Sequence, residues 1–375
     1  MADQLKTFFS PALVRRLAAD VERVHPDFDA RAFAKAATRG LEDLELLDRG
    51  RHIARALARF LPGSYPDAID VLIKSLGPEH ATDELVGAGM APFFYLPHTI
   101  FVAERGLDHF DLSMKAQFEL TKRFSAEGSI RPFIAKEPER TLRVLREWAR
   151  DPDAHVRRLV SEGTRLRLPW AMRVAWLDTH PERVLELLEL LKDDPTTLVR
   201  RSVANNLNDL GKVHPALLTK TAEAWLRSAS AERRALVEHA LRSAVKRGDP
   251  RALRLLGFGR KPAVVLENVR FVPRRVSIGG RVAMSFTLRS TARGIQELLV
   301  DVAVNFVKAR AKTSRKIFKV KRVSLPPGDM VELRTSVSLA IHTTRKPNPG
   351  KHEVEVVVNG EPFSAGAFTV TADTR

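Results

Sequence analysis

The chain has 375 residues, of which 44% are apolar and 7% aromatic, and its formal net charge at pH 7 is +17. It has room for two domains that each bury a core. It contains no cysteine, no initial signal-peptide pattern and no stretch approaching 18 apolar residues. We therefore expect no secretion, membrane span or thiolate chemistry, and we expect a location in the cytoplasm.

Residues 1–256 are predicted to form a domain of consecutive helices. Apolar residues recur at helical spacing, as between residues 184 and 191, and strand-type alternation is absent. An aspartate followed by proline predicts a helix start, and this pair occurs at Asp151-Pro152, Asp194-Pro195 and Asp249-Pro250.

One short pattern recurs within these helices, an arginine followed four residues later by a polar residue. The copies are Arg123 with Glu127, Arg158 with Glu162, Arg201 with Asn205, and Arg234 with Glu238. Their second members lie 35, 43 and 33 residues apart, a spacing typical of helix pairs that stack as repeats. Stacking would bring these side chains to one surface. The third copy has Asn205 at this position, but Asp209, one helical turn later, would place a carboxylate on the same face.

The simplest alternative for this pattern is a surface ion pair within one helix, worth a few tenths of a kcal/mol. Arginine before glutamate is the less favourable order for such a pair. Glycine follows both Glu127 and Glu162, which is typical of tight packing or a nearby ligand.

Trp170 ends a charged tract that begins at Glu162 and runs through Arg165, Arg167 and Pro169. The indole could anchor a core, or it could form an exposed wall beside a cationic ligand. The charged neighbours favour the exposed wall, because a tract with this much charge is unsuited to a deep core. Trp148, Trp176 and Trp225 have no comparable neighbours and are interpreted as packing residues.

Residues 260–375 are predicted to form an all-β domain. Short runs rich in β-branched residues are separated by turn residues such as Asn359-Gly360. Six or seven strands in this length are typical of an immunoglobulin-like sandwich. The runs cover residues 264–266, 282–288, 298–307, 317–323, 331–339 and 354–358.

Positive charge is concentrated in this second region. From residue 257 onward there are 21 Lys and Arg against nine Asp and Glu, and residues 308–322 hold eight basic residues and no acidic one. We expect this tract to be a basic loop or edge that contacts the DNA backbone, although such charge can also serve solubility alone. The arginines of the helical repeats could likewise track phosphates or form a solvated face. The predicted DNA-binding residues are Arg123, Arg158, Arg165, Arg201, Lys312, Arg315, Lys316 and Lys319.

Common catalytic motifs are absent: there is no HExxH, Walker-type loop, GxSxG or GxGxxG. The histidines show no ligand-like pairing, so we expect no metal and no cofactor.

Several tracts together resemble the bacterial AlkC-type DNA alkylation-repair glycosylases. These are Leu120 to Glu127 with Ile130-Arg131-Pro132-Phe133, Ser161-Glu162-Gly163-Thr164-Arg165 to Leu168-Pro169-Trp170, and Val203 to Asp209. The chain departs from the family pattern at Gly128-Ser129, where a bulkier apolar pair is expected, and at Leu166, where proline is expected.

The resemblance implies a mainly α chain, with a HEAT-like helical-repeat domain followed by a small immunoglobulin-like sandwich. It implies a bacterial, nucleoid-associated DNA glycosylase that removes cationic bases, chiefly 3-methyladenine and 3-methylcytosine, from double-stranded DNA. Glu127, Glu162 and Asp209 would be its catalytic carboxylates, and Trp170 would lie beside the lesion.

No lysine occupies the repeated Glu/Asn position, so we expect a monofunctional enzyme, and we expect a monomer. Two alternatives are a non-enzymatic DNA-binding protein and a helical-repeat scaffold for other proteins. A carboxylate cluster within a basic surface would favour the enzyme.

Overall fold

The computed structural model describes residues 5–80, 89–308, 313–341 and 347–372. The chain divides into two compact units, the first comprising Met1–Leu218 and Trp225–Ala240 and the second comprising Thr219–Ala224 and Leu241–Arg375. Helices make up the first unit, and a β-sandwich with eight strands in its described residues dominates the second. This is the mainly α fold class with an all-β terminal domain that the sequence predicts.

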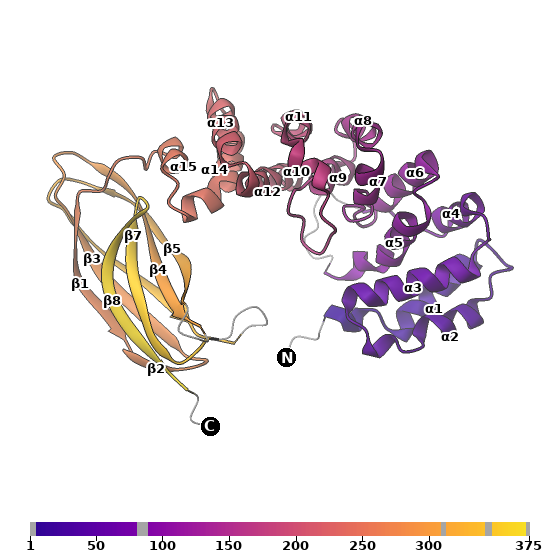
Figure 1. The fold of residues 1–375 in the computed structure, drawn as a ribbon, viewed down its shortest axis with the longest axis horizontal. Coiled ribbons are helices and arrows are strands. Elements are labelled where there is room, and N and C mark those ends of the chain that lie inside the picture. The colour runs from indigo at the N-terminus through magenta and orange to yellow at the C-terminus, as the bar shows by residue number, and fades with distance from the viewer. Residues whose placement is uncertain (1–4, 81–88, 309–312, 342–346, 373–375) are drawn as a thin grey trace. The chain divides into compact units, whose positions relative to one another are not determined.

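The helices follow one another in chain order (Figure 1). Those before residue 122 are η1 (Leu5–Phe8), α1 (Pro11–Glu22), α2 (Ala30–Thr38), η2 (Leu41–Asp43), α3 (Leu46–Phe60), α4 (Tyr65–Lys74), η3 (Ala91–Tyr95), α5 (Leu96–Arg105) and α6 (Phe110–Thr121). The remainder are α7 (Arg131–Lys136), α8 (Pro138–Trp148), α9 (Ala154–Gly163), α10 (Ala175–Thr179), α11 (Pro181–Leu191), α12 (Thr197–Val213), α13 (Pro215–Leu226), α14 (Ala231–Lys246) and α15 (Pro250–Leu255).

Helix α9 is central to the packing of the first unit, because it contacts α6, α8, α11 and α12. Its apolar positions are fully buried, as at Val156, Leu159 and Val160. Facing positions of α12, such as Val203 and Leu207, are also fully buried. This apolar seam holds α9 and α12 side by side and so aligns their polar residues.

Two of the three helix starts predicted from aspartate-proline pairs are wrong by two or three residues. Helix α15 begins at Pro250, with Asp249 accepting backbone hydrogen bonds as its N-cap. The earlier pairs lie in turns ahead of α9 and α12: Asp151 accepts from the backbone of Asp153, and Asp194 accepts from that of Thr196. These local bonds satisfy the aspartates before the helix starts.

The strands of the second unit form two sheets. They are β1 (Val264–Val272), β2 (Arg275–Ser277), β3 (Arg281–Ser290), β4 (Gln296–Val307), β5 (Thr313–Leu325), β6 (Met330–Ser338), β7 (Gly350–Val358) and β8 (Glu361–Thr371). One sheet has the order β1-β3-β6, and the other has the order β2-β8-β7-β4-β5. All pairs are antiparallel except β2 with β8.

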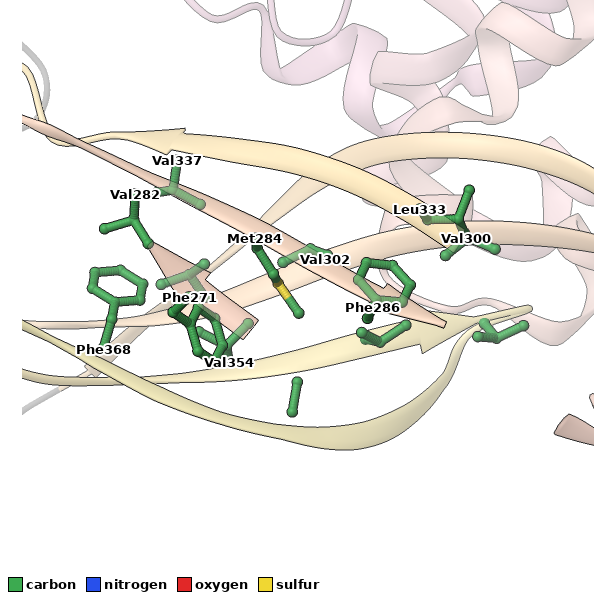
Figure 2. Close-up of a cluster of buried hydrophobic side chains, with 14 of the residues drawn as sticks. Phe271, Val282, Met284, Phe286, Val300, Val302, Leu333, Val337, Val354 and Phe368 are labelled. Atoms are coloured by element: carbon green, nitrogen blue, oxygen red, sulfur yellow. The ribbon is translucent and has the colours of Figure 1, made fainter. Parts of the chain in front are cut away.

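The sandwich core is apolar and continuous. Figure 2 shows Met284 and Phe286 of β3 in one cluster with Val302 of β4 and Phe368 of β8. Alternate residues of β3 are buried, as the period-2 pattern of a half-exposed strand requires. The cluster therefore consists of inward-facing residues from both sheets.

The predicted turn at Asn359-Gly360 joins β7 to β8, and both residues have left-handed backbone angles, with φ of 48° and 85°. A Cβ on Gly360 would lie 2.8 Å from Cδ1 of Leu253 in α15. Glycine is needed here both for the backbone conformation and for the close approach of α15.

Candidate active site

Helices α9 and α12 bring two buried carboxylates to one arginine. Glu162 on α9 is 5% exposed, and Asp209 on α12 is 1% exposed. Arg165 donates from Nη1 to Oε2 of Glu162 at 2.9 Å and from Nε to Oδ2 of Asp209 at 2.8 Å. Lys212 donates to Oδ1 of Asp209 at 2.7 Å. Burial alone would lower the pKa of Arg165, but the two carboxylates together raise it.

Glu127, in the turn between α6 and α7, is the more accessible third carboxylate. Its side chain is 31% exposed. Oε2 accepts from Oγ of Ser125 at 2.9 Å and from Nη2 of Arg158 at 3.2 Å. Because Arg158 belongs to α9, this ion pair connects neighbouring repeats.

The recurring arginines do not pair with the glutamate of their own copy. Arg158 contacts Glu127, the glutamate of the preceding copy, and not Glu162. Arg123 contacts Glu119, four residues before it in α6. A pair with the glutamate four residues later is therefore wrong for both copies. Stacking of the helices gives Arg158 a partner in the preceding copy, whereas Arg123 pairs with a glutamate of its own helix.

The glycines that follow the two glutamates serve different purposes. A Cβ on Gly163 would lie 2.7 Å from Cγ2 of Ile130, so this glycine allows close packing of α9. A Cβ on Gly128 would have no atom within 4 Å. Gly128 therefore faces open space beside Glu127.

Arg131 fixes the loop that carries Trp170, a role that the sequence analysis missed. The Arg131 side chain is almost completely buried. Nε donates to the carbonyl oxygen of Met172 at 2.6 Å, and Nη1 donates to those of Gly163 and Arg165 at 2.8 Å each. Burial lowers the pKa of Arg131 to about 10. The only sequence signal was its place in the tract that resembles the family.

Trp170 is 67% exposed, so the core-anchor interpretation is wrong. Its φ is 60°, a left-handed conformation that side chains of this size rarely adopt. Such strain persists only where surrounding contacts impose it, and it clusters at functional sites. The packing interpretation holds for Trp225, which is buried and donates to Glu189.

A cavity of about 570 Å³ adjoins three of the predicted site residues, Glu127, Arg158 and Trp170. Apolar residues such as Phe124 and Met172 form much of its wall. The arrangement of a carboxylate, an exposed indole and an apolar cavity fits a flat, cationic organic group.

The predicted DNA-binding residues fall into two groups. Arg123, Arg158 and Arg165 have side chains only 13 to 17% exposed and already contact carboxylates, whereas Arg201 is exposed on α12. In the second unit, Arg315, Lys316 and Lys319 are exposed on β5, an edge strand of the larger sheet. Arg315 also pairs with Glu355 at 2.9 Å. Lys312 lies outside the described residues, and residues 313–322 of the basic tract are strand rather than loop.

The described ranges, residues 5–80, 89–308, 313–341 and 347–372, contain neither a metal-binding cluster nor a membrane-spanning helix. No group of three or more His, Cys, Asp or Glu side chains there could hold a metal ion. No helix there is long and apolar enough to span a membrane.

Comparison with known proteins shows similarity over nearly the whole chain. A family model described as a DNA alkylation repair enzyme matches residues 124–247, and a model of the C-terminal Ig-like domain of the uncharacterised protein YhaZ matches residues 265–372. YhaZ of Bacillus subtilis (strain 168) is 33% identical over 373 residues, covering 99% of this chain and 100% of that protein. The solved structure of the Pseudomonas fluorescens alkylpurine DNA glycosylase AlkC, bound to DNA containing an abasic site analog, is 36% identical with a TM-score of 0.90, covering 98% of this chain and 100% of that chain.

Proposed function

Because this chain belongs to the AlkC-type family of DNA alkylation-repair proteins, we propose that it is a DNA glycosylase. It hydrolyses the N-glycosidic bond of cationic N-alkylated bases, chiefly 3-methyladenine and 3-methylcytosine, in duplex DNA. The observation that carries the proposal is that Glu162 and Asp209 share Arg165, while Glu127, paired with Arg158, lines a cavity together with the exposed Trp170.

The charge of the substrate makes carboxylates suitable catalysts. A 3-methylated base in DNA is already cationic, so its electron-deficient ring is a good leaving group without protonation. When the bond between C1′ and the base nitrogen breaks, the electron pair goes to the base and neutralises it. The positive charge that develops on the deoxyribose is then stabilised by nearby carboxylates.

Water completes the reaction. Its oxygen bonds to C1′, and its proton passes to a carboxylate acting as general base, which contributes about 10²–10⁴-fold. We assign this role to Glu162, because it lies between the other two carboxylates in repeat order. Arg165 contacts Oε2 of Glu162, so Oε1 is the oxygen we assign to the water. Glu127 and Asp209 support Glu162 by stabilising the positive charge on the deoxyribose.

Trp170 provides the contact with the lesion. A cation over an indole face gains about 0.5–2 kcal/mol, and Trp170 presents its ring to solvent rather than to the core. A neutral base lacks this cation–π attraction, so the indole favours positively charged alkylated bases over normal bases.

The proposed enzyme is monofunctional. A strand-cleaving glycosylase uses a neutral amine that forms a Schiff base with the sugar. The lysine beside the site, Lys212, donates to Asp209 at 2.7 Å, so its amine is engaged in an ion pair. The product should therefore be an intact strand that carries an abasic site.

Incubation of the protein with methylated duplex DNA tests the proposal directly. We expect free 3-methyladenine and 3-methylcytosine in the supernatant, identified by mass spectrometry. We also expect strand breaks only after hot alkali treatment. Tight binding of methylated DNA without any released base would refute the enzyme and favour a DNA-binding protein without catalysis.

A further inference from the structure

The cavity next to Trp170 is much larger than a methyl substituent requires. Its volume is about 570 Å³, within the range of about 300–1,000 Å³ that is typical of pockets for drug-sized ligands. Since a methyl group would fill little of it, a methylated base alone leaves its size unexplained.

The cavity wall is suited to an apolar, flat group. Leu96 and Ile100 of α5 face it together with Phe124, Trp170 and Met172. Aromatic and aliphatic walls of this kind favour an aromatic ring, which packs by offset stacking or edge-to-face contact. Charged side chains also border it, but both signs are represented, by Glu104 and Glu127 and by Arg51 and Arg158. The wall therefore gives no preference for a charged substituent.

Gly128 keeps the cavity open on the side of the carboxylates. It lines the cavity next to Glu127, and a Cβ at this position would meet nothing within 4 Å. Its neighbour Ser129 is 5% exposed and donates to Oε1 of Gln117 and to the carbonyl oxygen of Ala126, so its hydroxyl is bonded to the protein.

We infer that this cavity is a subsite for apolar N3 substituents larger than methyl, and that Gly128 is the residue that admits them. The substrate class is N3-alkyl- and N3-aralkyladenine in DNA, with a benzyl group as the representative member. The inference rests on the proposed glycosylase function and leaves its chemistry unchanged: the bond from C1′ to N9 breaks, N9 keeps the electron pair, and water supplies the oxygen to C1′.

The test compares release of 3-methyladenine and 3-benzyladenine from duplex DNA under single-turnover conditions. A hydrophobic pocket discriminates about 10- to 200-fold per methylene, so a site shaped for methyl would reject benzyl by more than about 100-fold. We expect wild type to release the benzyl base within about 10-fold of the methyl base. A ratio below about one hundredth overturns the inference.

Two substitutions fill the cavity from different elements. Gly128→Leu extends from the wall next to Glu127, and Ala103→Leu extends from α5. Each should lower the benzyl-to-methyl ratio by about 10-fold or more, whereas the matched variant Gly128→Ala should change it by less than about 3-fold. An unchanged ratio in both leucine variants overturns the inference. Failure of wild type to release 3-methyladenine would instead refute the proposed function.

Discussion

Arg165 and Asp209 lie 44 residues apart in the sequence, yet Nε of Arg165 donates to Oδ2 of Asp209 at 2.8 Å. The same guanidinium holds Glu162, three residues before Arg165. Two buried carboxylates are thus kept together by one buried cation. Without it, mutual repulsion and desolvation would oppose placing both in one site.

Arg165→Ala should therefore destabilise the protein strongly. Removal of one partner from a buried ion pair costs about 3–5 kcal/mol. Glu162 would stay buried without this partner, whereas Asp209 would keep its contact with Lys212. Urea unfolding followed by circular dichroism measures the loss. As a control, Arg334→Ala removes an exposed partner of Glu332 and should cost less than about 1 kcal/mol. Equal losses in the two variants would contradict the importance of this cluster.

Arg131→Met should loosen the loop that carries Trp170. The substitution leaves the carbonyl oxygens of Gly163, Arg165 and Met172 without this donor, each at a cost of about 1–3 kcal/mol. Hydrogen exchange of residues 164–172 should accelerate, and base release should fall. Arg140→Met, at an exposed ion pair with Asp111, serves as the control. Unchanged exchange in this loop would refute the positioning role.

Trp170→Ala should lower base release at little cost in stability. The side chain is 67% exposed, so its loss should change the free energy of unfolding by less than about 1 kcal/mol. Trp225→Ala, at a buried position, should cost about 3–5 kcal/mol. Trp170→Phe should keep part of the activity because an aromatic face remains. A Trp170→Ala variant with normal base release would remove Trp170 from the site.

His98 should make stability depend on pH. It is fully buried on α5, and burial lowers its pKa to about 4, whereas the pKa in the unfolded chain is about 6.5. The unfolded state therefore binds the extra proton first, and stability falls as pH decreases from about 7 to 4, by about 3 kcal/mol in total. Unfolding of wild type and His98→Phe across this range should show a flatter profile for the variant. Parallel profiles would contradict the prediction.

The exposed lysines of β5 should contribute to DNA affinity through phosphate contacts. Each contact adds about 0.9 to the slope of log K against log salt, so alanine at both Lys316 and Lys319 should reduce the slope by nearly 2. Arginine at both positions keeps the charge and should preserve it. Fluorescence anisotropy at several salt concentrations measures the slope, and an unchanged slope for the alanine variant would exclude these contacts.

The repeat spacing predicted the helical unit, because stacking follows from period and apolar pattern, and the structure joins Glu162 and Asp209 through Arg165. It could not predict which arginine pairs with which carboxylate. Arg158 contacts Glu127 rather than Glu162, since the angle and register of packed helices decide such contacts. The role of Arg131 was hidden for the same reason: its partners are backbone oxygens of a loop that begins 32 residues later.

The sequence analysis did not predict strand β8, because the local composition there argued against a strand. Strand β8 contains Pro362 and Gly366, which are both unfavourable within a sheet. Gly366 has a φ of 98°, and the pairing of β7 with β8 shifts register nearby, between Val354 and Glu355. The sheet accommodates these residues through an irregularity that the one-dimensional pattern does not record.

The central claim is that Glu162 is the carboxylate that activates water, and Glu162→Gln tests it most directly. Glutamine keeps the size of the side chain but cannot accept the proton. Single-turnover release of 3-methyladenine should fall by about 10²-fold or more, while affinity for DNA with an abasic-site analogue stays within about 3-fold. Glu79→Gln, at an exposed glutamate near Lys122, is the matched control and should behave as wild type. Release by Glu162→Gln at the wild-type rate would contradict the account.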